Sequence, residues 1–229
     1  MTALRPAAVL LDIVGTTTPS SFVDDTLLAY VRDCLPGLLA RADPQPSVAS
    51  ALAEVRRLVP QGDPLPALLD WMAAGVSTAP LKTLQDVIWA EGFAAGAIRG
   101  ALYPEVAARL RRWSHAGLSL SVFAGGTSAT QRLLFRHSVD GDLAPLFRGF
   151  FDARIGGRRE PDSYGRLAIA VGLPSIEVAF LSADEEALDA AAAAGLHTCQ
   201  IVRDPGIAPS DRHETAGDLT AAAGMLGLP

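Results

Sequence analysis

The sequence predicts an α/β fold, with a parallel sheet and an all-helical domain inserted after the first strand. Five apolar residues, 7–11, run directly into Asp12 and then into a turn of glycine and threonines, which is typical of a buried parallel strand. The next stretch, 19–100, carries only helical patterns, whereas short strands alternate with helices from Tyr103 onward. This alternation favours a doubly wound parallel sheet with right-handed crossovers.

The individual elements follow from the spacing of apolar residues and from the breaks between them. In the inserted stretch the predicted helices are 22–39, 48–58, 65–74 and 82–93. Beyond the insertion the predicted strands are 118–123, 149–155, 178–182 and 197–202. The predicted helices there are 104–116, 128–135, 164–171 and 185–194. We therefore expect a core domain of 1–18 and 101–229 and a helical cap domain of 19–100.

Composition excludes several classes of protein. The chain has 229 residues, of which 49% are hydrophobic and 19% charged, with a net charge of -6. An acidic chain without a basic patch argues against nucleic acid and membrane partners, and no apolar run approaches the ~20 residues of a membrane helix. The two cysteines, Cys34 and Cys199, do not suggest a disulfide framework. The beginning of the chain does not resemble a signal peptide, so a cytoplasmic protein is expected.

Asp12 is the first candidate for chemistry, because ligands of open α/β sheets bind at the carboxyl ends of the strands. The alternative is that its side chain only caps the following turn. Two later strands end in polar or glycine-rich segments, 124–127 and 182–184. Parallel strands end at one edge of the sheet, so these segments are expected to converge on Asp12.

The strand-end aspartate, the helical insertion and the converging strand ends resemble the haloacid dehalogenase (HAD) superfamily. Longer segments are similar to the enolase-phosphatases of methionine salvage, also called acireductone synthases. These segments are DIVGTTTPSSFV, LKTLQDVIWAEGF, YPEVAARLRRW, QRLLFRHSVDGDLAPLFRGFFD, GGRREPDSY and FLSADEEALDAA. The resemblance spans about 9–202 and implies a HAD-like, Rossmann-like parallel sheet with a cap domain. It also implies that Asp12 is the phosphate-attacking nucleophile or a metal ligand.

The chain departs from the family where its chemistry resides. Val14 stands where the family has a second acid, and Ala124 and Gly125 stand where it has two serines that hold phosphoryl oxygens. Backbone N–H groups of Gly125, Gly126 and Thr127 could still bind an anion at the following helix N-terminus.

The third and fourth family motifs are also changed. Arg158 replaces the family's lysine, which keeps the positive charge. Ala183 replaces the aspartate that holds Mg²⁺, and Asp184 follows one position late. A shift of one residue at a strand end turns a side chain to the opposite face. We therefore expect no cofactor, with Mg²⁺ held by Asp12 and Asp184 only if it is retained.

Three hypotheses remain for function. The main one is metal-independent chemistry on a small anionic metabolite, with Asp12 and Arg158 as catalytic residues. The HAD superfamily offers a precedent, because its 2-haloacid dehalogenases also lack the second acid of the first motif. The alternatives are a non-catalytic binding protein and a working acireductone synthase that releases phosphate from 2,3-diketo-5-methylthiopentyl-1-phosphate. From the cap, Phe22 and Lys82 are expected to contact substrate. A monomer or weak dimer is expected.

Overall fold

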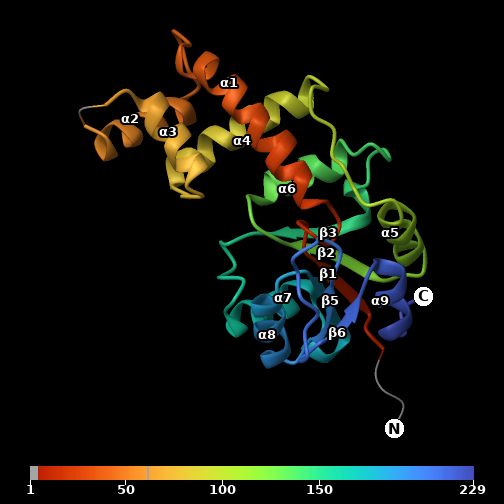
Figure 1. The fold of residues 1–229 in the computed structure, drawn as a ribbon. Helices are drawn as coiled ribbons and strands as arrows, with labels where there is room; N and C mark the ends of the chain where they lie inside the picture. The colour runs from red at the N-terminus through yellow and green to blue at the C-terminus, as the bar shows by residue number, and fades with distance from the viewer. Residues whose placement is uncertain (1–4, 61) are drawn as a thin grey trace. The chain divides into compact units, whose positions relative to one another are not determined.

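Six parallel strands form one sheet in the order β3-β2-β1-β4-β5-β6 (Figure 1). The structure is a computed structural model and describes residues 5–60 and 62–229. The strands are β1 Ala8–Leu11, β2 Ser119–Phe123, β3 Phe147–Phe151, β4 Val178–Ser182, β5 His197–Ile201 and β6 Glu214–Ala216. This sheet confirms the predicted α/β class.

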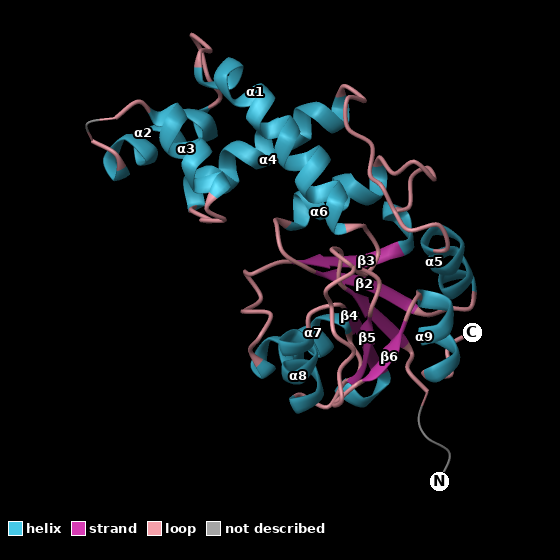
Figure 2. Cartoon of the chain, viewed as in Figure 1, coloured by secondary structure: helices cyan, strands magenta, loops and turns pink. Residues whose placement is uncertain are grey.

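The central strands are buried on both faces, as their unbroken apolar sequences require. Figure 2 shows helices flanking the strands. The helices of this part are α5 Val106–His115, α6 Ser128–Arg136, α7 Pro161–Val171, α8 Glu185–Ala193 and α9 Leu219–Met225. On one face, Leu10 and Phe180 pack with Tyr164 of α7 and Leu188 of α8 in a single apolar cluster. The Tyr164 ring centroid lies 5.3 Å from that of Phe180, which fixes α7 against the centre of the sheet.

The chain divides into two compact units, one made of Gly100–Pro229 and the residues up to Ser20, the other of Ser21–Arg99. The second unit begins with a π-helical segment, Phe22–Leu28, and is otherwise α-helical. Its α-helices are α1 Ala29–Leu39, α2 Pro46–Leu58, α3 Pro64–Ala73 and α4 Ala79–Ala94. Apolar side chains from all four α-helices form its own core. The role of 19–100 as a functional cap stays a prediction.

Two features at the edges of the sheet differ from the sequence prediction. The strand expected at 149–155 ends at Phe151, because Asp152 begins a turn in which the Ile155 N–H donates to the Asp152 carbonyl at 3.0 Å. β6 and α9 were not predicted. A three-residue strand is too short to show a period of two, and β6 is defined only by its pairing with β5.

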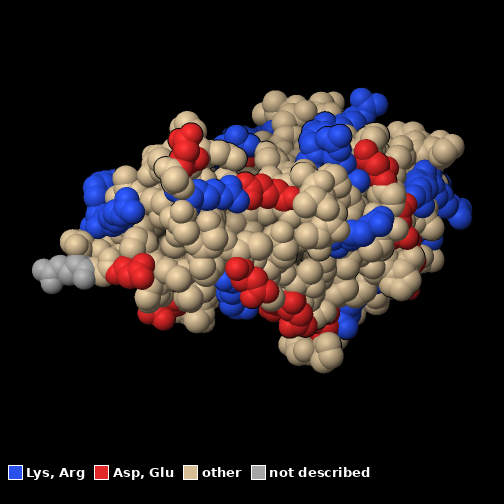
Figure 3. All heavy atoms as spheres, turned by 90° about the horizontal axis from the view of Figure 1, so that it is seen from above, with Lys and Arg blue, Asp and Glu red and all other residues tan. Residues whose placement is uncertain are grey.

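No helix in the described part of the chain is long and apolar enough to cross a membrane. On the face drawn in Figure 3, acidic and basic side chains are interspersed.

The Asp152 carboxylate connects the end of β3 to the start of α6. It accepts hydrogen bonds from the Ser128 N–H at 2.8 Å, the Arg154 N–H at 3.0 Å and the Arg154 guanidinium at 2.9 Å. The Arg154 hydrogen bond is the main reason that the pKa of Asp152 lies well below its usual range. The ionised carboxylate is therefore a stabilising element of the native state.

Asp152→Asn is expected to lower the free energy of unfolding by about 1–3 kcal/mol at neutral pH, because charged hydrogen bonds become neutral or are lost. A depressed native pKa stabilises above the unfolded-state value of about 3.9 and stops doing so as the pH falls through the native pKa. The difference in free energy of unfolding between wild type and variant, measured by urea denaturation, should therefore become smaller below about pH 4. Asp162→Asn, at an exposed position of α7, is the control, and an equal loss there would contradict the assignment.

Candidate functional site

Asp12 directly follows β1, which pairs with β2 on one side and with β4 on the other. Its N–H donates to the Leu181 carbonyl of β4 at 3.0 Å, which extends the ladder by one residue. The following turn is closed by the Thr16, Thr17 and Thr18 N–H groups, which all donate to the Ile13 carbonyl. Gly15 adopts φ 70° in this turn, a conformation that favours glycine. The local sequence therefore holds the carboxylate at the carboxyl edge of the sheet.

Asp12 is only 4% exposed, and both of its carboxylate oxygens accept hydrogen bonds. Its Oδ1 accepts from the Ile13 N–H at 2.7 Å. Its Oδ2 accepts from the Ser182 hydroxyl at 2.7 Å and forms an ion pair with the Arg158 guanidinium. Burial raises the pKa of Asp12 above its ordinary value, whereas Arg158, then Ser182, act to lower it. Arg158 is thus the main group that favours the ionised form.

A pocket of about 510 Å³ opens beside Asp12. Its wall is built by the turns that follow β1, β2, β4 and β5 and by the segment before α7. The lining residues are Asp12, Val14, Gly15, Ser20, Gly125, Arg158, Ala183, Asp184, Asp204 and Ile207. The predicted convergence of the strand ends is therefore observed within this unit.

Arg158 lies between two carboxylates of the pocket. One guanidinium nitrogen contacts Asp12, and the other lies 3.9 Å from the Asp184 carboxylate. The Tyr164 hydroxyl donates to the Arg158 carbonyl at 2.7 Å and anchors this segment to α7. The Arg158 side chain is 25% exposed, and no acceptor in the described residues pairs with its buried Nε. It therefore keeps an unsatisfied donor beside the pocket.

Asp184 faces the pocket, contrary to the prediction that a one-residue shift turns it away. The alternation of faces holds only within a strand, and β4 already ends at Ser182. Asp184 is the N-cap of α8, and its Oδ1 accepts from the Glu186 N–H at 3.1 Å and the Ala187 N–H at 3.3 Å. Its other oxygen lies toward Arg158.

The glycine segment after β2 contributes one residue to the pocket wall. Gly125 lines the pocket, and a Cβ on it would meet no described atom within 4 Å. Gly126 and Thr127 lie outside this wall. Gly126 adopts φ 78°, and the Thr127 hydroxyl accepts from the Thr130 N–H at 3.3 Å as the N-cap of α6. Phosphate contact by these three residues stays a prediction.

Val14 and Ala183, which stand where the family has acidic residues, both line the pocket. Val14 is 43% exposed there. Ala183 is half-buried, and its N–H donates to the Thr16 hydroxyl at 3.1 Å. Both positions therefore line the pocket, although neither carries a carboxylate.

The two predicted cap residues belong to the second unit. Phe22 is buried at the start of the π-helical segment, and Lys82 is exposed on α4. Their contact with substrate stays a prediction.

Ser182, Asp204 and Ile207 were not singled out by sequence reasoning. Ser182 belongs to the FLSADEEALDAA segment, so its place at a strand end was the available signal. Asp204 and Ile207 lie in the irregular segment after β5, where no periodic pattern indicates which side chain faces the pocket.

The pocket can be tested for Mg²⁺ by its donor chemistry. Asp12 and Asp184 place two carboxylates on its wall, on either side of Arg158. The described residues contain no group of three or more His, Cys, Asp or Glu that could hold a metal. Mg²⁺ commonly takes one or two carboxylates and completes its shell with water and substrate phosphate. The donor set therefore fits Mg²⁺ in that form.

Curated relatives resemble this chain over its whole length. "Enolase-phosphatase E1" of Gluconacetobacter diazotrophicus is 45% identical and covers 100% of this chain and 99% of its own. The protein of the same name from Granulibacter bethesdensis is 46% identical over 98% of both chains. No protein-family model matches the chain.

These relatives overturn the expectation that no cofactor is needed. The relatives are named enolase-phosphatases, and the resemblance to that family implies an aspartate that holds Mg²⁺, so the expectation of no cofactor was wrong. The expectation rested on two arguments. Acidic residues are absent at two of the family's motif positions, and the Asp184 side chain was predicted to face away from the pocket. The relatives also favour the working acireductone synthase over the main hypothesis of altered chemistry.

Solved structures share the fold. The UTR4 protein of Saccharomyces cerevisiae superimposes with a TM-score of 0.78, at 28% identity, over 93% of this chain and 98% of that one. The CbbY protein of Rhodobacter sphaeroides, in complex with phosphate, gives a TM-score of 0.62 at 17% identity over 96% of both chains, which supports the fold alone. The full-length relatives show that the chain belongs to the enolase-phosphatases, and the solved structures show that it has the HAD fold.

Proposed function

We propose that this chain hydrolyses a phosphate monoester as an acireductone synthase does, with 2,3-diketo-5-methylthiopentyl-1-phosphate as its substrate. The observation that carries the proposal is the buried Asp12 carboxylate at a pocket, with Arg158 and Ser182 on one oxygen. A carboxylate held by a guanidinium next to an accessible pocket is suited to attack a phosphorus atom. The enolase-phosphatase relatives support the choice of substrate.

In this proposal the chain's own residues have separate tasks. Asp12 attacks the phosphorus atom, and Ser182 and the Ile13 N–H fix the orientation of its carboxylate. Arg158 favours the ionised form of Asp12 and attracts the phosphate, with its Nε as a further donor. Asp12 and Asp184 would hold Mg²⁺, which would supply charge stabilisation for the transferred phosphoryl group.

The test is phosphate release from this diketone phosphate, measured with Mg²⁺ and again with excess chelator. The proposal expects turnover with Mg²⁺ and a loss on chelation that added Mg²⁺ reverses. Tight binding of the substrate without phosphate release would favour the non-catalytic binding protein instead. Phosphate release that chelation leaves unchanged would contradict the Mg²⁺ assignment.

Substitutions at the fourth motif test which carboxylate holds Mg²⁺. Asp184→Asn is expected to raise the Mg²⁺ concentration for half-maximal activity about 10-fold or more, because one of two carboxylate ligands becomes a weaker amide. Ala183→Asp, which restores the family's acid, is expected to lower it below the wild-type value. Glu186→Asn, on the first turn of α8 and exposed, is the control. If wild type and the three variants reach half-maximal activity at the same Mg²⁺ concentration, this wall of the pocket is not the metal site.

A further inference from the structure

Asp204 places a third carboxylate on the pocket wall, from the segment after β5. Its Oδ1 accepts a hydrogen bond from the Tyr103 hydroxyl at 2.9 Å. Its Oδ2 lies 3.5 Å from the point that a Cβ on Gly15 would occupy, and that point is 3.0 Å from the Ala183 Cβ. One oxygen is therefore held by tyrosine, while the other lies beside the turn that carries Val14.

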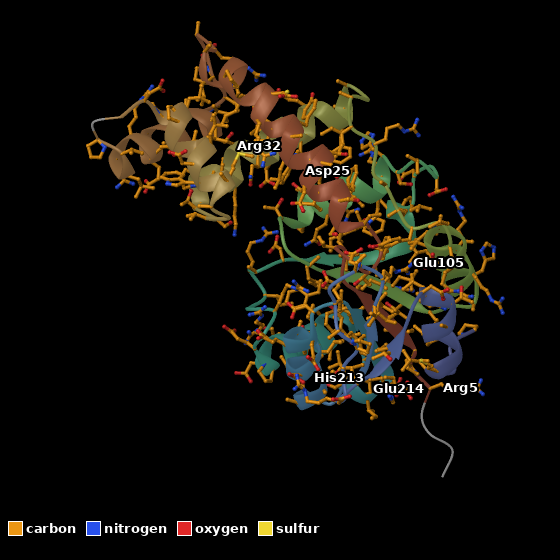
Figure 4. The ribbon with its side chains drawn as sticks, viewed as in Figure 1. Arg5, Asp25, Arg32, Glu105, His213 and Glu214 are labelled. Carbon is orange, nitrogen blue, oxygen red and sulfur yellow. The ribbon has the colours of Figure 1, made fainter. Side chains whose placement is uncertain are left out.

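Tyr103 is itself held in place from two sides. Its N–H donates to the Thr17 carbonyl of the turn after β1 at 3.0 Å. The Arg203 guanidinium lies 4.1 Å from the centre of its ring and pairs with Glu105. Glu105, labelled in Figure 4, directly precedes α5. Burial, then the Asp204 hydrogen bond, raises the pKa of Tyr103 to about 12. The hydroxyl is therefore a permanent donor near neutral pH and orients the Asp204 carboxyl group.

We propose that Asp204 is the general acid and base of this pocket and performs the proton transfer that Val14 cannot. A carboxyl group that is oriented by a neighbouring hydroxyl and lines the same pocket as the nucleophile has an arrangement suited to such a catalyst. Tyr103 is then a positioning residue. This proposal rests on the phosphatase function proposed above, and it gives the pocket a second acid from a different strand end.

The two steps balance as follows. Asp12 forms a bond to phosphorus, the bond from phosphorus to the ester oxygen breaks, and that oxygen takes its electron pair and the proton of the Asp204 carboxyl group. The ionised Asp204 then takes a proton from water, whose oxygen attacks the phosphorus atom of the aspartyl phosphate. The bond to Asp12 breaks, phosphate leaves, and both side chains return to their starting states.

A comparison of two esters with Asp204→Asn separates this role from a structural one. With 2,3-diketo-5-methylthiopentyl-1-phosphate the variant is expected to lose about 100-fold or more in kcat, since its leaving oxygen needs a proton. With p-nitrophenyl phosphate the leaving group is nitrophenolate, which departs without taking a proton. The variant should then release a burst of nitrophenol equal to the enzyme present, followed by slow turnover, because water activation is lost.

Three further variants complete the experiment. Asp211→Asn, an exposed aspartate of the same segment, should match wild type on both esters. Tyr103→Phe keeps the ring beneath Arg203 and should lower kcat with KM unchanged. Adding Val14→Glu to Asp204→Asn should restore part of the lost turnover, because an acid returns at the family's position.

The outcomes distinguish the two proposals. Wild-type turnover together with an Asp204→Asn variant that matches it on both esters would overturn the role of Asp204 alone. Loss of activity through KM, without a burst, would also overturn it. If wild type releases phosphate from neither ester, the phosphatase function fails and the role of Asp204 fails with it.

Discussion

Asp12→Asn is expected to lower kcat for phosphate release by about 10³-fold or more, because an amide cannot form the bond to phosphorus. Steady-state phosphate release at saturating Mg²⁺ measures the effect. In wild type, acid quenching during turnover should trap phosphate on the peptide that contains Asp12, whereas the variant should trap none. Substrate affinity should survive, since the amide leaves Arg158 and the rest of the pocket in place.

The control for this substitution must separate chemistry from folding. Asp12→Asn leaves Arg158 without its closest anion, so some loss of stability is expected from the broken buried pair. Asp162→Asn makes the same chemical change at an exposed position of α7 and should leave turnover unchanged. Thermal unfolding of both variants shows whether they remain folded at the assay temperature. A folded Asp12→Asn variant within about 10-fold of wild type would exclude Asp12 as nucleophile.

Arg158→Gln is expected to lower kcat/KM by about 10²-fold or more, because both the phosphate and Asp12 lose their nearest cation. Arg158 is the largest influence that lowers the pKa of the buried Asp12. Without it the pKa rises further, so the ionised nucleophile forms only at higher pH. The acidic limb of the pH–rate profile should therefore move to higher pH in the variant.

Arg158→Lys provides the matched comparison, since lysine is the residue that the family has at this position. A lysine keeps the charge but loses the second nitrogen that lies near Asp184. It should retain more activity than glutamine and shift the acidic limb less. If the Arg158→Gln and Arg158→Lys variants have equal activity and the same acidic limb, the pocket does not require a positive charge at position 158.

The sheet could be predicted because its signals are local. Each central strand is a short apolar run that ends in turn residues, and the helices between them show clear periodicity. Asp12 and Arg158 could be paired in advance because both occupy motif positions of a known family. In the structure the Arg158 guanidinium contacts the Asp12 carboxylate, and the catalytic roles of both residues stay a prediction.

The rest of the pocket depends on contacts between distant segments. Tyr103 and Asp204 lie far apart in the sequence, and only the path of the chain after β5 brings the hydroxyl and the carboxylate together. Asp184 was misplaced for a related reason. The rule of alternating faces was applied beyond Ser182, where the strand has ended and helix capping decides the direction of the side chain.

The hydrogen bond from the Ala183 N–H to the Thr16 hydroxyl bears on how well the site tolerates substitution. It joins the two central turns through a main-chain donor, so their separation does not depend on the side chain at position 183. The acids of such a site can therefore be exchanged one at a time without collapse of the cavity.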